Sequence, residues 1–317
     1  MKIYFAPMEG ITDEIYRSLH HKHFPGINKY FIPFISPTSG MGLTNREKRS
    51  IALRNEGFVS VPQVLTKSAE NFIASARILA DIGYEEVNLN LGCPSGTVTG
   101  KGKGSAMLRD TDALKAFFDE VFSQNDLPEI SVKTRIGYTE VSEWEKIWAV
   151  LSAYPFCEVI IHTRTRNELY KGMVHHEALR LCENARFPIV ANGDLFSPES
   201  EKDIEEDYPF LSGIMIGRGA VANPMLACEM NEIQKSDKER LRAFHDELLK
   251  AYLDDRPVNA ALGHMCEIMF YQSNLFEGSK KFLKQMQKSR TAADYSAAAD
   301  AMFDSCPLRD EPYYCPF

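Results

Sequence analysis

The chain has 317 residues and a net charge of −8, because 44 Asp and Glu outnumber 36 Lys and Arg. This length suits a barrel of about 250 residues with a smaller appended domain. The apolar runs are strand-sized, far below the ~20 residues of a membrane span, and Pro7 and Glu9 interrupt the N-terminus too early for a signal peptide. We therefore expect no membrane attachment, and any nucleic-acid partner must bind at a local basic patch.

The seven cysteines lie far apart and form no Cys-x-x-Cys pair. This pattern favours reduced thiols in the cytoplasm over a disulfide framework or a zinc site. Five histidines lack the spacing of metal ligands and are expected on the surface: His20, His21, His23, His175 and His176. We expect a cytoplasmic protein that binds no metal and acts as a monomer.

Strand patterns alternate with helical patterns along most of the chain. The expected strands are Lys2–Ala6, Lys29–Ile35, Val59–Leu65, Glu86–Leu91, Ile130–Thr134, Glu158–His162, Pro188–Ala191 and Gly213–Ile216. Eight such β/α repeats predict an α/β fold, a closed (β/α)8 TIM barrel, rather than an open sheet.

Three of the intervening helices carry recognisable start signals. Ser68 is expected to cap a helix that ends before Gly83. Asp112 is expected to cap the helix that carries the apolar stripe of Leu114 and Phe118. Ser142 and Glu145 have the spacing of a capping box for the following helix.

The pattern changes after residue 231, where strand signals stop. Helices are expected at Lys238–Tyr252, Val258–Gln272, Leu275–Lys288 and Ala292–Phe303. The third ends in the run Lys280–Arg290, which has five positive charges and no acidic residue. Such a run is either a solvated helix face or a nucleic-acid contact. We predict a barrel domain over residues 1–231 and a small helical domain over residues 232–317.

The most informative stretch is Glu86–Ser105. An alternating strand places Cys93 between Gly92 and Pro94, and a glycine-rich run with Lys101 and Lys103 follows. This run predicts a mobile, cationic loop. A thiol at the end of a barrel strand, next to Asn90, indicates an active site. The alternative is a structural cysteine before a turn, since cysteine is often buried as a small apolar residue.

Polar residues recur where the other expected strands end. The set comprises Met8, Glu9, Gln63, Lys133, Arg135, His162, Arg164, Asn192–Asp194 and Gly217–Gly219. The charged Lys133, inside an apolar strand, needs a polar partner. The glycine turns at Asn192–Asp194 and Gly217–Gly219 fall where barrels bind phosphate. The residue pattern thus predicts a phosphate-binding barrel enzyme with a cofactor.

These motifs resemble the tRNA-dihydrouridine synthase family, flavin enzymes that reduce a uridine of tRNA. The matching segments are Ala6–Asp13 with Arg17, Asn88–Pro94, Ser131–Gly137, His162–Arg164 with Tyr170–Gly172, Asn192–Asp194 and Gly217–Gly219. The helical tail also suits the RNA-binding domain of the family. The acidic overall charge is a departure, which leaves the tRNA contacts to local basic patches.

The resemblance implies FMN at the mouth of the barrel. Pro7, Met8 and Glu9 would lie against the flavin ring, and Gln63 and Lys133 would bond its polar edge. The phosphate end would be held by His162, Asn192, Gly193, Asp194, Gly217 and Arg218. A cation near the polar edge of a flavin stabilises its reduced form, which agrees with the position of Lys133.

The resemblance also implies the reaction. Hydride from the reduced flavin would reach C6 of uridine, and Cys93 would protonate C5, since a thiol of pKa about 8.5 is mostly protonated near neutrality. NADPH would supply the electrons from the same open face. The flipped base and its tRNA would contact Asn90, Lys101, Lys103 and Arg164, and the tail residues Lys280, Lys281, Lys284 and Lys288.

Two alternatives remain open at this point. One is an FMN-dependent barrel oxidoreductase that acts on a small pyrimidine or another unsaturated carbonyl compound, which would not need the basic tail. The other is a barrel that binds flavin or RNA without catalysis, which would not need Cys93.

Overall fold

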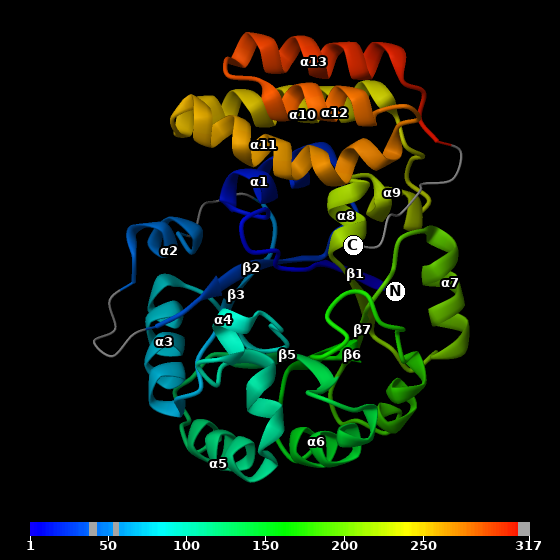
Figure 1. The fold of residues 1–317 in the computed structure, drawn as a ribbon. Coiled ribbons are helices and arrows are strands. Elements are labelled where there is room, and N and C mark those ends of the chain that lie inside the picture. Colours follow the sequence, from blue (N-terminus) through cyan, green and yellow to red (C-terminus); the bar gives the residue numbers. More distant parts are fainter. Residues whose placement is uncertain (38–42, 53–56, 310–317) are drawn as a thin grey trace.

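The computed structural model describes residues 1–37, 43–52 and 57–309, and its centre is a closed barrel of eight parallel strands (Figure 1). The strands are β1 (Lys2–Phe5), β2 (Lys29–Ile35), β3 (Ser60–Val64), β4 (Glu86–Leu91), β5 (Glu129–Gly137), β6 (Glu158–Thr165), β7 (Ile189–Asn192) and β8 (Gly213–Ile216). They pair in chain order, and β1 closes the barrel against β8. The predicted (β/α)8 barrel is confirmed.

Side chains alternate across each strand, because successive residues point to opposite faces. Inward-facing residues fill the barrel interior as a separate apolar cluster: Tyr4, Ala6, Phe31, Val61, Ile160, Val190 and Met215. Outward-facing neighbours such as Ile3 and Phe5 join the larger core between the strands and the helices. The barrel is therefore a packed core, and its polar residues collect at the strand ends.

Helices surround the barrel. They are α1 (Glu14–His23), α2 (Asn45–Ser50), α3 (Ala69–Ile82), α4 (Gly96–Thr99), α5 (Thr111–Phe122), α6 (Trp144–Leu151), α7 (Pro198–Asp207), α8 (Arg218–Ala222) and α9 (Leu226–Met230), with 3₁₀ turns η1 (Gly104–Arg109), η2 (Val141–Glu143) and η3 (His176–Cys182). The stretch after Cys93 therefore contains α4 and η1, where the sequence predicted only a mobile, cationic loop.

The predicted caps of α3 are confirmed, and two other caps are corrected. Ser68 accepts a hydrogen bond from the Asn71 N–H, and Gly83 ends α3 at a φ of 112°. Asp110, not Asp112, caps α5, because its carboxylate accepts from the Ala113 N–H at 2.9 Å.

The capping box expected for α6 lies elsewhere. Glu140 and Glu143 bond each other's backbone N–H groups around η2, and α6 follows at once. The Glu143 carboxylate also accepts from the Tyr138 N–H at 2.6 Å. Ser142 and Glu145 therefore do not form the box.

The C-terminal part consists of α10 (Lys238–Asp255), α11 (Val258–Gln272), the turn η4 (Ser273–Leu275), α12 (Lys280–Lys288) and α13 (Ala292–Ser305). The third predicted helix starts later than expected, since Gly278 adopts a φ of 71° before α12. These helices lie together on one side of the barrel (Figure 1), where α10 packs on α1 and α11 on α8. At this contact Phe244 of α10 lies edge-on to Tyr16 of α1, with ring centroids 5.6 Å apart.

The surface position expected for the five histidines is wrong for His20 and holds only in part for the other four. His20 is buried between the barrel and α10, and its Nδ1 lies 2.8 Å from the Tyr30 hydroxyl. The other four are partly buried, for example His23, which pairs with Glu247 of α10. These contacts arise because α1 is enclosed between the barrel and the helical part.

Within the described ranges, no helix is long and apolar enough to cross a membrane. The same part of the chain contains no group of three or more His, Cys, Asp or Glu side chains arranged to hold a metal. The six cysteines that the structure describes are free thiols, and Cys315 lies outside the described residues.

Candidate active site

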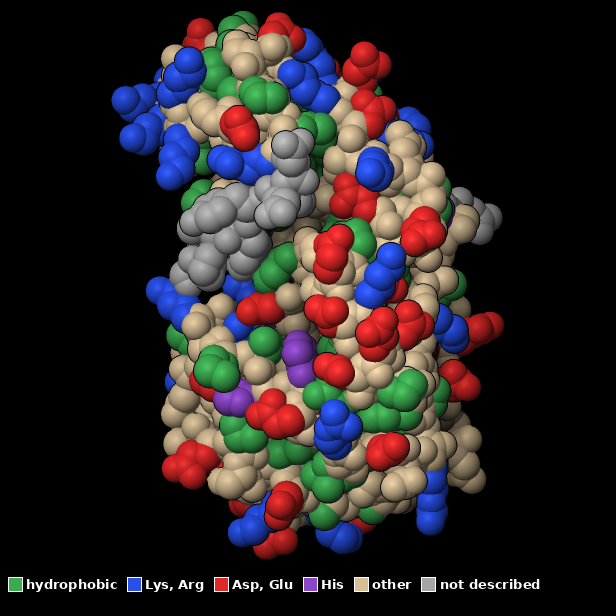
Figure 2. Space-filling model, turned by 90° about the vertical axis from the view of Figure 1, so that its right-hand side faces the viewer, with side chains coloured by type: hydrophobic (Ala, Val, Ile, Leu, Met, Phe, Trp, Pro, Cys, Tyr) green, Lys and Arg blue, Asp and Glu red, His purple; other side chains and the backbone are tan. Residues whose placement is uncertain are grey.

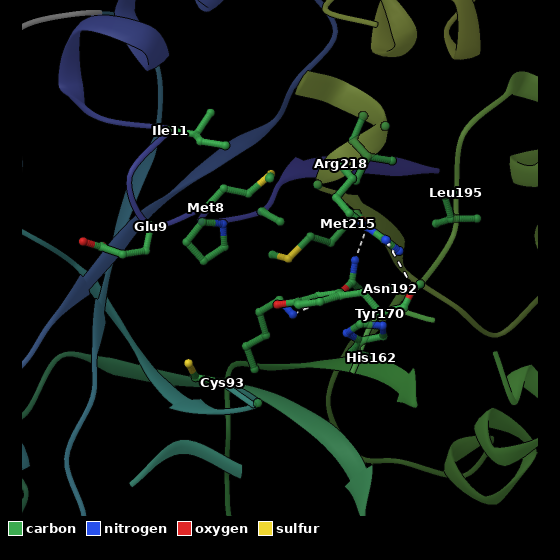
Figure 3. Close-up of a pocket in the computed structure, with 18 of the residues that line it drawn as sticks. Met8, Glu9, Ile11, Cys93, His162, Tyr170, Asn192, Leu195, Met215 and Arg218 are labelled. Carbon is green, nitrogen blue, oxygen red and sulfur yellow. Dashed lines mark hydrogen bonds between the residues drawn. The ribbon is translucent and has the colours of Figure 1, made fainter. Parts of the chain in front are cut away.

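A pocket of about 460 Å³ opens at the carboxyl ends of the strands (Figure 3). Asn90 and Cys93 line this pocket. So do all the residues expected to bind the cofactor: Pro7, Met8, Glu9, Gln63, Lys133, His162, Asn192, Gly193, Asp194, Gly217 and Arg218. Cys93 and Arg218 lie at opposite ends of the pocket, with Met8 and Met215 between them (Figure 3). The volume is within the usual range for a cofactor or ligand site.

The side chains of Asn90 and Ser105 hold the backbone of Cys93 in place. The Asn90 carboxamide oxygen accepts from the N–H groups of Gly92 and Cys93, at 3.1 and 2.8 Å. On the other side, the Ser105 hydroxyl donates to the Cys93 carbonyl at 2.9 Å. Burial raises the pKa of the Cys93 thiol, although a backbone bond at Ser95 and the nearby Arg135 and Lys133 act in the opposite direction. The thiol is therefore protonated at neutral pH and suits a proton donor better than a nucleophile.

A chain of buried amides crosses three strands beneath Cys93. Asn90 donates to the Gln63 oxygen at 2.6 Å, and Gln63 donates to the Asn88 oxygen at 2.7 Å. Asn88 in turn donates to the Ser131 hydroxyl at 2.8 Å. Because a carboxamide nitrogen has two protons, Gln63 retains one donor position for a group in the pocket.

Lys133 projects from the middle of β5 into the pocket. Its ammonium donates to the Asn192 oxygen at 2.9 Å, which supplies the polar partner expected for it. Burial, reinforced by the neighbouring Arg135, lowers the pKa of Lys133 to about 7. A polar or anionic group in the pocket would stabilise its charged form.

Arg218 and Arg164 share one carboxylate at the other end of the pocket. Asp194 accepts from Arg218 at 2.6 Å and from Arg164 at 2.8 and 2.5 Å. Arg164 is only 2% exposed and also donates to the Gly172 carbonyl. This burial argues against the direct substrate contact expected for Arg164. Its guanidinium instead holds Asp194, the carboxylate that also pairs with Arg218.

The same end offers groups suited to an anion. Gly193 adopts a φ of 133°, and a Cβ there would meet Val174 at 2.9 Å, so only glycine fits this turn. The Nε2 atom of His162 is buried and makes no hydrogen bond within the described structure. Burial, together with Arg135 and Lys133, lowers the pKa of His162 well below its usual value, so the ring is neutral. An unpaired ring nitrogen, a glycine turn and the Arg218 guanidinium together fit a phosphorylated cofactor.

Among the other residues that line the pocket, Arg135, Tyr170 and Tyr271 are polar side chains to which the sequence assigned no role. Arg135 is 1% exposed and donates to the carbonyls of Gly92, Thr165 and Leu169. Tyr170 lies between two guanidinium groups, 5.2 Å from Arg135 and 5.1 Å from Arg218. Arg135 and Tyr170 both fall within the segments that match the family, so the sequence could have indicated that they belong to the site. Tyr271 comes from α11, and no local pattern indicates that it reaches the pocket.

The remaining lysines expected to contact substrate lie outside the pocket lining. Lys101 and Lys103 are on the turn between α4 and η1. The four lysines of α12 are all exposed, whereas Phe282 and Met286 of the same helix are buried against the helical core. Figure 2 shows several Lys and Arg side chains gathered at the upper left, on the helical part, and mainly Asp and Glu in the middle of the flank below.

The barrel and its pocket define the class of protein: a (β/α)8-barrel enzyme whose site, at the carboxyl ends of the strands, suits a phosphorylated cofactor. The sequence model of the dihydrouridine synthase (Dus) family matches residues 4–306. The chain belongs to the dihydrouridine synthase family and is a flavin-dependent oxidoreductase.

Individual relatives agree over most of the chain. A protein of Bacillus subtilis (strain 168) described as "Probable tRNA-dihydrouridine synthase 2" is 30% identical over 258 residues, which cover 78% of this chain and 76% of that protein. The "tRNA-dihydrouridine synthase B" of Pasteurella multocida (strain Pm70) is 29% identical, over 74% of this chain and 70% of its own. That of Shewanella oneidensis is 24% identical and covers 94% of both chains.

Solved structures support the barrel fold. A variant of NCR from Zymomonas mobilis has a TM-score of 0.51 and 12% identity, and covers 75% of this chain and 88% of that one. Morphinone reductase has the same TM-score and coverage at 8% identity. At such low identity the likeness concerns the fold alone.

Proposed function

We propose that this protein uses FMN and NADPH to reduce a uridine of tRNA to 5,6-dihydrouridine. The observation that carries the proposal is the pocket itself, in which a protonated Cys93 lies at one end and a phosphate-binding set around Arg218 lies at the other. Family membership and the names of the relatives, which are tRNA-dihydrouridine synthases, supply the substrate.

The residues that would hold FMN are those that fit a phosphorylated ring cofactor. Arg218, Gly193 and His162 would bind its phosphate end, and Gln63 and Lys133 would bond the polar edge of the ring. Met8 and Met215 form apolar walls between these two ends. The flavin held by these residues would supply, in its reduced form, the hydride that uracil accepts at C6.

The chain's own contribution to the chemistry is a proton. Addition of hydride at C6 leaves negative charge at C5 and O4 of the uracil, and protonation at C5 completes the reduction. Cys93 donates this proton, because its raised pKa keeps the thiol protonated. Asn90 acts as a positioning residue, since its amide is engaged with Gln63 and with the backbone of Cys93. Lys133 and Arg135 lie near Cys93 and stabilise the thiolate that forms.

The target base has to leave the tRNA stack, because the reacting groups lie inside a barrel mouth that a duplex cannot enter. We assign the barrel, residues 1–231, to the chemistry and the helices of residues 232–317 to tRNA binding. The exposed lysines of α12 offer a local basic surface on a chain of net charge −8. Tyr271 of α11 reaches the pocket, so the helical part also borders the reacting site.

The test is to map dihydrouridine in tRNA from cells that lack this protein. We expect one or more dihydrouridines to be missing, and to return with the wild-type gene but not with Cys93→Ala. A tRNA population with unchanged dihydrouridine would contradict the proposal, and would favour a small unsaturated carbonyl compound as the substrate.

A further inference from the structure

Three lysines gather at the turn between α4 and η1, and one of them, Lys67, comes from a different part of the barrel. Lys67 directly precedes the cap of α3, while Lys101 and Lys103 lie between α4 and η1. The Lys67 ammonium lies 3.5 Å from the position that a Cβ on Gly102 would occupy. We refer to Lys67, Lys101 and Lys103 as the lysine cluster.

The cluster lies against the Cys93 segment because the glycines between the lysines permit close approach. Gly104 adopts a φ of 60°, and a Cβ there would meet the Cys93 carbonyl at 2.9 Å and the Cys93 Cβ at 3.1 Å. The next residue, Ser105, donates from both its N–H and its hydroxyl to the same carbonyl. Lys103 therefore directly precedes a segment that is bonded to Cys93, and Lys67 approaches the same turn at Gly102.

No carboxylate within the described residues forms an ion pair with any lysine of the cluster, although other lysines in that part of the chain have acidic partners, for example Lys29 with Glu86 and Lys202 with Glu232. The Lys103 ammonium instead donates to the Ser36 hydroxyl at 2.8 Å. Burial lowers the pKa of Lys103, and the charges of Lys101 and Lys67 lower it further. Like charges placed together without an acidic partner are costly, and an anion bound among them would remove that cost.

We infer that the lysine cluster binds a backbone phosphate of the RNA next to the flipped nucleotide. The inference rests on the proposed function and extends it, because Lys67 is assigned a role that no local motif gives it. With the target uracil against Cys93, the phosphates of that nucleotide lie within the reach of side chains bordering the Cys93 segment.

Phosphate could also come from NADPH, which shares the open face of the barrel. The RNA backbone is favoured because the cluster adjoins the proton donor, which is needed only when the uracil is present, whereas a nicotinamide has no use for Cys93. The two sources are separated by testing the two half-reactions independently.

The experiment compares Lys67→Gln with wild type, with Lys67→Arg as the charge-preserving variant and Lys146→Gln on α6 as the control for an exposed lysine elsewhere. Binding of unmodified tRNA to the oxidised holoenzyme is measured across a range of KCl concentrations. For Lys67→Gln we expect affinity to fall by about 3- to 10-fold, as for one partly screened charged contact. The log–log salt slope should fall by roughly 0.7 to 0.9. Lys67→Arg should restore both, and Lys146→Gln should match wild type.

Flavin reduction by NADPH is then measured without tRNA. An increased KM for NADPH in Lys67→Gln, with unchanged tRNA binding, would overturn the assignment to RNA. Unchanged tRNA affinity and salt slope would likewise overturn it. If wild-type protein binds and reduces no tRNA, the proposed function fails as well, whereas a failure confined to Lys67→Gln overturns only this inference.

Discussion

Cys93 is the residue whose surroundings bear most directly on the reaction. Its thiol is buried and its pKa is raised, while its backbone is held by Asn90 and Ser105. For Cys93→Ala we expect normal retention of FMN and normal reduction by NADPH, because no described contact of the thiol supports either step. Reoxidation by tRNA should slow by about 10²- to 10⁴-fold, the usual contribution of a general acid. A variant that reoxidises at the wild-type rate would return Cys93 to a structural role.

Lys133 gives the site a predicted pH dependence. Because burial lowers its pKa to about 7, the ammonium is charged below that pH and loses its charge as the pH rises. The groups around it, Arg135 and a neutral His162, do not change charge over the same range, whereas the Cys93 thiol titrates only at high pH. We expect FMN to dissociate more readily at pH 9 than at pH 7, by a few-fold. Lys133→Met should bind weakly at both values, and a variant that kept the wild-type pH profile would assign the effect to another group.

Arg218 is expected to act in binding rather than in the chemistry. It pairs with Asp194 at the end of the pocket remote from Cys93. We expect Arg218→Ala to weaken FMN retention by at least about tenfold, since the substitution removes a charge-assisted hydrogen bond to phosphate. The FMN-saturated variant should transfer hydride at a rate close to wild type, and Arg218→Lys should restore part of the affinity. Equilibrium FMN binding measures the first effect, and a change only in the chemical step would contradict the assignment.

At the residue scale, strand-end positions were predictable and the partners of each side chain were not. The sequence predicted Cys93 at the end of one strand and Lys133 on the next strand. The closed barrel brings the carboxyl ends of these strands together. Arg164 was expected at the substrate, yet its guanidinium is buried against Asp194 and the Gly172 carbonyl. The difference arises because Gly172 belongs to a loop after β6 whose path depends on tertiary packing.

At the element scale, helix α12 distinguishes the two proposed substrates, because an enzyme that acts on a small molecule would not need its basic face. Its four lysines are exposed while Phe282 and Met286 anchor the helix. Neutralising Lys280, Lys281, Lys284 and Lys288 together should weaken tRNA binding. The log–log salt slope should fall by roughly one unit for each lysine–phosphate pair that the substitutions remove.

The control for α12 neutralises three exposed lysines on the outer helices α5, α6 and α7, namely Lys115, Lys146 and Lys202. It should leave tRNA affinity unchanged, and NADPH oxidation without tRNA should be unchanged in both proteins. If the α12 variant keeps its tRNA affinity and salt slope, the run is only a solvated helix face.

Elements with strong periodicity were predicted closely, and their ends less so. Strands β2, β4 and β8 and helix α11 have the predicted bounds, because their apolar patterns stop at clear turn signals. The cap of α5 was misplaced because Asp110 and Asp112 both suit such a position, and only the local geometry selects Asp110. The box expected for α6 was misplaced because Glu140 and Glu143 form it around η2 in place of Ser142 and Glu145. The turn around Gly102 and Gly104 could not be predicted from its glycines, which also suit an open loop.

At the scale of the whole molecule, the helical part is joined to the barrel close to the pocket. Asp13, which caps α1, accepts from the Tyr252 hydroxyl at 2.9 Å and from Arg256 at 3.1 Å. The preceding turn holds Met8, whose N–H donates to the Thr12 hydroxyl at 2.9 Å. A contact between residues 239 positions apart cannot be read from local patterns, and neither can the arrival of Tyr271 at the pocket. These contacts fix the helical part relative to the pocket, as the proposed binding of tRNA on α12 requires.

The most direct test of the account uses the purified, flavin-loaded protein in two anaerobic steps. NADPH is added first to reduce the flavin, and the reduced protein is then mixed with an unmodified tRNA transcript in a single turnover. We predict that the released cofactor is FMN, that the tRNA reoxidises it, and that one dihydrouridine forms for each flavin reoxidised. A flavin that stays reduced in the presence of the transcript, or reoxidises without forming dihydrouridine, would contradict the account.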